Sequence, residues 1–222
     1  MQVEGRAEIR TLVSGVTASA ALIERAEAAG ADAILVHHGY FWRGEDPRLT
    51  GVKRERIARL LRAGIGLFAY HLPLDAHPEV GNNAQLAARL GVGIERWAGE
   101  DGLIALGRLS APATLGGFAA AVTLAVGRTP QVFGDPGRPV ERVGLCTGAA
   151  QGHFGQAVDL GVDVYVTGEV SEPQYHLAAE SGVGFVAAGH HATEVFGVQA
   201  LGAHLAARFG LVHRYIDIPN PV

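Results

Sequence analysis

Apolar residues recur along the first half of the chain with helical spacing in some segments and as short continuous runs in others. Residues 20–30 have helical spacing, and Gly30 stands where a C-cap is expected. The run 33–36 predicts a short buried strand. A second helix is predicted over 53–63 and a second strand over 67–70. Helix and strand in repeated alternation predict an α/β layered fold.

The second half of the chain repeats parts of the first half in the same order. Three pairs of segments match, namely 13–17 with 143–147, 30–36 with 161–167, and 64–69 with 182–187. Their nearly constant spacing predicts two similar α/β lobes from an internal duplication. The alternative is that similar strand and turn patterns arose independently in a chain with 31 glycines.

The stretch between the two halves differs from both of them in its composition and in its pattern of apolar residues. It contains an alanine-rich helical segment near 115–126 and a turn-like sequence at 134–137. We therefore predict a first α/β lobe over 1–98, an insert or connection over 99–140, and a second α/β lobe over 141–222.

Composition and charge narrow the classes of function. The chain has 222 residues, is 48% hydrophobic and carries a net charge of -4, with its 18 Lys and Arg spread along the chain. No basic run tracks a phosphate backbone, and aromatic residues make up only 7%, so dedicated nucleic-acid binding is not expected.

Other features exclude a membrane protein and a disulfide-stabilised one. The single cysteine, Cys146, cannot form an intrachain disulfide, and we interpret it as a small buried residue rather than a nucleophile. No apolar run approaches the ~20 residues of a membrane helix. Residues 1–5 do not have the pattern of a signal peptide. We therefore expect a protein of the reducing cytoplasm, with no membrane partner.

Histidines and carboxylates gather directly after the predicted strands. The carboxyl ends of parallel strands are where α/β folds bind ligands. His37 and His38 follow strand 33–36, His71 and Asp75 follow strand 67–70, Glu169 follows strand 164–166, and His190, His191 and Glu194 follow strand 185–188.

These residue types suit a metal site. Imidazole is the commonest metal ligand in proteins, and carboxylates neutralise the charge of a divalent ion. His190 and Glu194 are four residues apart, so they share one face of a helix that begins at 190 or 191. A carboxylate can bridge two ions about 3.5–4 Å apart.

Each of these features also has a purely structural interpretation. A His-His pair can be a packing feature, Asp75 can belong to a turn, and His190 with Glu194 can be a local polar pair at a helix start. His71, His191 and Glu169 can be ligands, hydrogen-bond partners of ligands, or substrate contacts. The other histidines are assigned to packing or the surface, namely His77, His153, His176, His204 and His213.

Four blocks of sequence resemble a known family. They are Val36-His-His-Gly-Tyr-Phe-Trp42, the run 71–86 that begins His-Leu-Pro-Leu-Asp, Val166-Thr-Gly-Glu169, and Ala188-Gly-His-His-Ala-Thr-Glu194. In this order they are similar to the YbgI-like, or Nif-three-like, dinuclear metal-centre family. Many of its members are labelled GTP cyclohydrolase I type 2. The similarity extends over nearly the whole chain.

The resemblance implies a ligand set, a fold and an assembly. The implied fold is two α/β lobes with the metal site between them, and the implied assembly is a toroidal hexamer with its sites facing an internal cavity. A helix before the first strand is also implied, and the chain starts within that strand. The implied metal ligands are His37, His38, Asp75, His190 and Glu194, with His71 as a sixth candidate.

The leading functional hypothesis is a metal-dependent hydrolase acting on a nucleotide-like small molecule. Two divalent ions per subunit would activate a water, and Zn, Mn, Fe or Ni suits a mixed set of imidazole and carboxylate ligands. Glu169, His71 or His191 would relay the proton. The alternatives are a metal-delivery protein without catalytic turnover and a ring-shaped interaction scaffold that metal stabilises.

Overall fold

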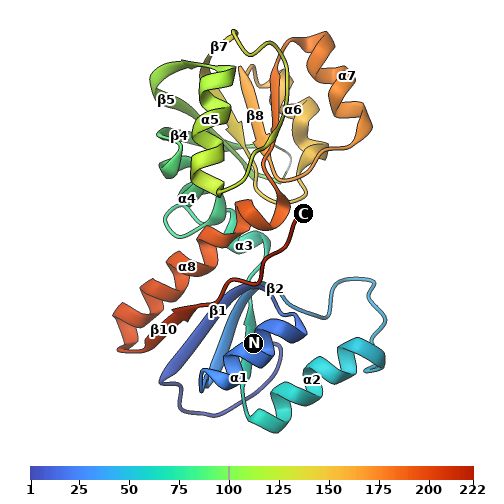
Figure 1. Cartoon of the computed structure of the whole chain (residues 1–222), viewed down its shortest axis with the longest axis vertical. Coiled ribbons are helices and arrows are strands. Elements are labelled where there is room, and N and C mark those ends of the chain that lie inside the picture. The colour runs from blue at the N-terminus through green and yellow to red at the C-terminus, as the bar shows by residue number, and fades with distance from the viewer. Residues whose placement is uncertain (100) are drawn as a thin grey trace. The chain divides into compact units, whose positions relative to one another are not determined.

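The computed structural model of the chain describes residues 1–99 and 101–222 and divides into two compact units (Figure 1). Unit 1 comprises Met1–Leu74 and Gly197–Pro219, and unit 2 comprises Asp75–Phe196 and Asn220–Val222. The chain therefore passes between the units at 74–75, at 196–197 within one helix, and at 219–220.

Unit 1 is built on a parallel sheet whose strands lie in the order β10-β1-β2-β3. Its strands are β1 (Thr11–Thr17), β2 (Ala33–His38), β3 (Gly66–Ala69) and β10 (Val212–Tyr215). In β2 the residues are buried in succession on both faces, as the continuous apolar run of a central parallel strand requires. The short bridge from Val3 to Leu67 places the first residues of the chain beside β3.

Helices cover both faces of this sheet. Helices α1 (Ala20–Ala28) and α2 (Gly51–Ala63) pack through Leu22, Ile23 and Leu60 on a core that includes Ile34 and other strand residues. The last turns of α8 (His190–Phe209) pack on the other face. Ser19 caps α1 by accepting the Leu22 N–H at 3.2 Å, so this helix begins where an oxygen side chain satisfies a free backbone donor.

Unit 2 is built on a mixed sheet whose strands lie in the order β4-β5-β7-β8-β9-β6. Strands β7, β8 and β9 are parallel, and the outer strands pair antiparallel. The bounds are β4 (Val92–Ala98), β5 (Ile104–Thr114), β6 (Gln131–Phe133), β7 (Pro139–Leu145), β8 (Val164–Thr167) and β9 (Gly184–Ala187).

Alternation along β8 and β9 sends side chains into two separate cores. Val164 and Val166 face one core, with helices α4 (Asn82–Arg89) and α5 (Leu115–Val126), while Tyr165 faces the other, with α6 (Phe154–Asp159) and α7 (Glu172–Ser181). Two short helical segments complete the unit, η1 (Gln151–His153) and α3 (Leu72–Asp75), whose last residue is the first of unit 2.

The α/β class predicted from the sequence is confirmed, and the unit boundaries are drawn differently from the predicted lobes at 1–98 and 141–222. The segment 99–140 supplies β5, α5 and β6 to unit 2, so its apolar residues belong to that unit's core. Residue 100, which falls in this segment, lies outside the described residues. The duplication stays a prediction. The segments matched in the sequence do occupy consecutive parallel strands in both sheets, β1-β2-β3 and β7-β8-β9.

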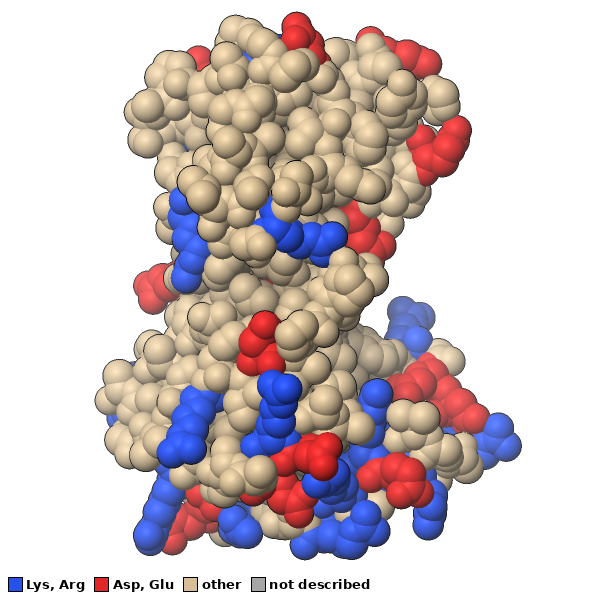
Figure 2. Space-filling model, viewed as in Figure 1, with Lys and Arg blue, Asp and Glu red and all other residues tan. Residues whose placement is uncertain are grey.

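Surface charge is mixed on the face that Figure 2 shows. Over α1 and α2, basic and acidic side chains alternate. Several form ion pairs, such as Arg59 with Glu27 at 2.6 Å and Arg6 with Asp32 at 2.8 Å. Within 1–99 and 101–222, no helix has both the length and the apolar character that crossing a membrane requires.

Candidate metal centre

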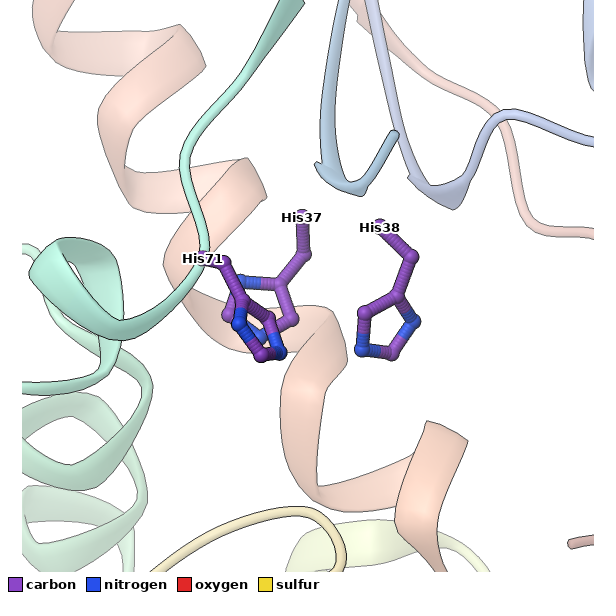
Figure 3. Close-up of side chains that lie close together, drawn as sticks. All are labelled: His37, His38 and His71. Carbon is purple, nitrogen blue, oxygen red and sulfur yellow. The ribbon is translucent and has the colours of Figure 1, made fainter. Parts of the chain in front are cut away.

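Three histidines of unit 1 meet at the carboxyl ends of β2 and β3. His37 and His38 are the last residues of β2, and His71 follows β3 by two residues. The ring centroid of His37 lies 4.8 Å from those of both His38 and His71, and the His38–His71 distance is 5.4 Å. Each ring offers a nitrogen within 4.8 Å of the others, and Figure 3 shows the rings side by side. The sequence prediction that these histidines gather is confirmed.

Hydrogen bonds set the orientation of two of these rings. Nδ1 of His37, a residue with no exposed surface, lies 2.9 Å from the backbone oxygen of Tyr70. A carbonyl can only accept, so Nδ1 carries the proton and Nε2 carries the lone pair that a metal would bind. His38 Nδ1 lies 3.2 Å from the Thr17 hydroxyl of the neighbouring strand β1, which orients that ring, although a hydroxyl can donate as well as accept and so does not fix which nitrogen carries the proton.

Asp75 in unit 2 is a buried carboxylate held by side chains from distant segments. Only 5% of its surface is exposed. Its Oδ1 accepts hydrogen bonds from Asn82 Nδ2 at 2.9 Å and from the Thr147 hydroxyl at 3.2 Å. The Thr147 N–H in turn donates to Asn83 Oδ1 at 2.8 Å. A carboxylate so constrained is oriented before any ligand binds, as a metal ligand needs to be.

His190, Glu194 and Glu169 form the second cluster of unit 2. His190 Nε2 lies 3.2 Å from Glu194 Oε2, one helical turn along α8, and His190 Nδ1 lies 2.7 Å from Glu169 Oε1, just after β8. Glu194 is 2% exposed. The hydrogen bond to Glu194, with a smaller contribution from Glu169, raises the pKa of His190 to about 9 against the opposing effect of burial. Glu169 thus fixes the orientation of the His190 ring with Nε2 facing Glu194.

Two glycines let the backbone close around this cluster. A Cβ on Gly148, which has φ +73, would overlap Oε1 of Glu194. A Cβ on Gly168 would come within 2.6 Å of the His190 Cα and 2.7 Å of the Gly148 carbonyl oxygen. The Gly148 N–H donates to the hydroxyl of Thr193 at 3.0 Å, which ties the start of α8 to the loop that follows β7.

The structure brings together some predicted site residues within each unit. Unit 1 joins His37, His38 and His71, and unit 2 joins Glu169, His190 and Glu194, while Asp75 lies in unit 2 among amides and a hydroxyl. His191, in the first turn of α8, donates its backbone N–H to the Val222 oxygen at 3.0 Å.

Two of the histidines that the sequence analysis assigned to packing or the surface have recorded side-chain partners outside the candidate metal site. His213 lies 2.8 Å from the Ser14 hydroxyl, and His176 pairs with Glu172 on the surface of α7. Sequence reasoning missed the polar residues that orient the candidate ligands. Asn82 and Asn83 lie in the run 71–86 that resembles the family, and Thr147 lies in the repeated segment 143–147, but no spacing rule linked them to Asp75.

The donor set fits divalent ions. It combines imidazole nitrogens whose outer nitrogens are already hydrogen-bonded with buried carboxylates, the combination that binds Zn, Mn, Fe or Ni. The fold and the side chains therefore define a class: an α/β protein with candidate metal ligands at the carboxyl ends of its parallel strands.

Comparison with known proteins identifies the family. The profile of Duf34/NIF3 (NGG1p interacting factor 3) matches residues 1–221, and the chain belongs to this family. A relative from Pseudomonas aeruginosa, named GTP cyclohydrolase 1 type 2 homolog, is 53% identical over 224 residues, which cover 100% of this chain and 88% of the relative. A relative of the same name from Escherichia coli K12 is 48% identical, with 100% and 89% covered.

Solved structures agree with this assignment. The protein ybgI, described as of unknown function, superposes with a TM-score of 0.96 at 47% identity, covering 100% of this chain and 90% of that one. The protein TTHA1606 from Thermus thermophilus superposes with a TM-score of 0.89 at 37% identity, covering 100% and 88%. The resemblance recognised in the sequence is thereby confirmed.

Proposed function

We propose that this protein is a dinuclear metal-dependent hydrolase that acts on a nucleotide-like small molecule. The observation that carries the proposal is the oriented imidazole and carboxylate groups at the strand ends of each unit. Hydrogen bonds from Nδ1 to Tyr70 and to Glu169 make Nε2 the ligand nitrogen of His37 and of His190.

The proposed ligands come from both units. They are His37, His38, Asp75, His190 and Glu194, holding two divalent ions per subunit, with His71 as a sixth candidate. Ions bound there would supply Lewis acidity and would lower the pKa of a coordinated water towards neutrality.

The chain's own residues would orient these ligands and move protons. Glu169 holds the Nδ1 proton of His190, which keeps Nε2 directed at Glu194. His71, beside both His37 and His38, and His191, next to His190, are the candidates for taking a proton from water and passing it to the leaving group.

The substrate class and the assembly belong to the same proposal. The curated relatives are named GTP cyclohydrolase 1 type 2 homologs, which favours a purine nucleotide as the substrate. We propose that the chain acts in the cytoplasm as a homo-oligomer, a hexameric ring with its sites facing the internal cavity. Size-exclusion chromatography with light scattering would give the mass of the assembly, and a monomer would contradict the ring.

The test combines elemental analysis with an unbiased substrate panel. Wild-type protein loaded with zinc, manganese, iron or nickel is assayed against GTP, other nucleotides and small phosphoesters. Asp75→Ala removes a buried proposed ligand, and His176→Ala is the matched control, because His176 lies on the surface of α7, where it contacts Glu172 and the Tyr175 ring. We expect two equivalents of metal and turnover in wild type and in His176→Ala, and the loss of both in Asp75→Ala.

Other results would remove the hydrolase. One equivalent of metal or less per wild-type chain contradicts the dinuclear centre. Two equivalents without turnover on the whole panel contradicts catalysis, and transfer of that metal to an apo-acceptor protein would then favour metal delivery. Loss of assembly in a Glu194→Ala variant, with no turnover by the wild type, would favour a scaffold.

A further inference from the structure

The loop between β2 and α2 exposes two aromatic rings, and one of them, that of Trp42, lies beside the histidines of unit 1. Phe41 and Trp42 are 49% and 43% exposed. The Trp42 ring centroid lies 4.7 Å from that of His71, at an interplanar angle of 73°, and 6.4 Å from that of His38. Aromatic side chains contribute most when their faces are covered, and conspicuous exposed aromatics are typical of binding surfaces.

The loop is held in a strained conformation. Phe41 has φ 62, and no other non-glycine residue of the described part of the chain has a positive φ. Such a conformation in a bulky residue persists only where neighbours impose it, and it is concentrated at functional sites. Here Glu45 accepts the Trp42 N–H at 2.9 Å and donates its own N–H to the Trp42 carbonyl at 3.0 Å. Lys53 pairs with Glu45 at 3.0 Å and lies 5.6 Å from the Phe41 ring centroid.

The start of the loop is anchored in the core of unit 1. The buried Tyr40 donates its hydroxyl to the Ala18 carbonyl at 2.5 Å. The side-chain amide of Gln2 bonds both backbone groups of Tyr40, at 2.6 and 2.7 Å. A Cβ on Gly39 would overlap the Gln2 side chain, so only glycine allows this contact. The two exposed rings therefore project from a fixed base.

We propose that Trp42, in the loop that it shares with the exposed Phe41, is a stacking platform for a planar heteroaromatic ring, of the purine base class, at the mouth of the unit 1 histidine cluster. This inference rests on the proposed function and assigns its substrate-recognition element. Any nucleobase can stack on an aromatic side chain, because every base has a π face. The planar ring is the part of a nucleotide that this platform contacts, and Lys53, which lies near the Phe41 ring, is already paired with Glu45.

The two tryptophans of the chain allow a direct test. Trp97 lies in β4 of unit 2, so Trp97→Phe leaves Trp42 as the fluorescent reporter. The full-length variant, zinc-loaded, is titrated with guanosine, adenosine and cytidine, and with ribose 5-phosphate, which lacks a planar ring. We expect saturable quenching of Trp42 by the nucleosides and none by ribose 5-phosphate.

Affinity measurements by equilibrium dialysis complete the test. Trp42→Leu should weaken guanosine binding roughly 5- to 100-fold, the effect of losing one stacking partner, while zinc content stays that of wild type. Trp42→Phe, which keeps a ring, should restore most of the affinity. Trp97→Phe should bind guanosine as wild type does.

Several outcomes would overturn the inference. These are quenching by ribose 5-phosphate as strong as by guanosine, no saturable quenching by any of the three nucleosides, or unchanged guanosine affinity in Trp42→Leu. If Trp42→Leu changes the oligomeric mass and leaves guanosine affinity unchanged, the rings are a contact between copies. Trp42-dependent nucleoside binding without hydrolysis would support the platform and contradict the hydrolase. Hydrolysis that is insensitive to Trp42→Leu would support the hydrolase and contradict the platform.

Discussion

Replacing Gly148 by alanine should disable the unit 2 ligands while leaving the fold in place. The new Cβ would overlap Glu194 Oε1 and lie 3.5 Å from His190 Nε2. The backbone there cannot easily give way, because the Gly148 carbonyl accepts the Gly168 N–H at 2.8 Å and the Thr167 hydroxyl at 3.0 Å. Glu194 must therefore move, and its carboxylate leaves the position that it holds beside His190.

The magnitude follows from two separable effects. Gly148 has φ +73, and an alanine in this left-handed region costs about 1–2 kcal/mol of stability. Gly127, the C-cap of α5, also has φ +73, but nothing lies within 4 Å of its Cβ position. Gly127→Ala therefore carries the backbone strain alone. Only Gly148→Ala adds the displacement of Glu194, which should weaken metal binding about 10- to 100-fold, the usual effect of disturbing a ligand's orientation.

The assay is zinc binding by competition with a fluorescent chelator, alongside thermal denaturation of the metal-free proteins. Gly148→Ala should lose at least as much stability as Gly127→Ala, because it adds the displaced Glu194 carboxylate to the backbone strain, and each kcal/mol lowers the melting temperature by about 2–4 °C for a chain of this size. Zinc affinity should fall in Gly148→Ala and stay at the wild-type value in Gly127→Ala. Equal zinc affinity in both variants would refute the assignment of Glu194 as a ligand oriented by this close backbone approach.

Four further predictions concern buried polar groups and a glycine packed against one of them. Asn82→Ala should lower stability by about 1–3 kcal/mol in urea denaturation, because Asp75 Oδ1 loses a buried donor, and an unchanged midpoint would contradict this. Burial lowers the pKa of His213 in the folded protein. As the pH falls from about 6.5 to that lowered pKa, only the unfolded chain gains a proton, so the stability of the folded protein should decrease through this window. Gly202→Ala, whose Cβ would overlap the His213 ring, should destabilise the protein at every pH. Burial, and secondarily the charge of Asp75, raises the pKa of Cys146 to about 12, so maleimide should label it only after denaturation, and rapid labelling of the native protein would contradict its burial.

Periodicity predicted the regular elements of this fold well. The alanine-rich segment 115–126 coincides with α5, and α8 begins at His190, one of the two predicted starting points. These predictions succeeded because local apolar spacing and the residues at helix ends determine where a helix begins and stops. The same logic placed histidines at strand ends and so predicted the unit 1 cluster.

Contacts between distant segments could not be predicted from the sequence. The segment 99–140 was interpreted as an insert or connection because its composition differs from that of both halves, with Pro112, an alanine-rich helix and a turn-like stretch. In the structure, β5 lies in this segment and pairs with both β4 and β7. The support of Asp75 by Thr147 likewise depends on how two segments 72 residues apart meet in three dimensions. No local rule encodes such a contact.

The most direct test of the central claim is anomalous diffraction from crystals of zinc-loaded protein. The account predicts two peaks per chain, each at about 2.0–2.2 Å from imidazole nitrogens or carboxylate oxygens, with His37, His38, Asp75, His190 and Glu194 all engaged. A single peak held by the unit 1 histidines alone, or no peak near Asp75 and Glu194, would contradict it.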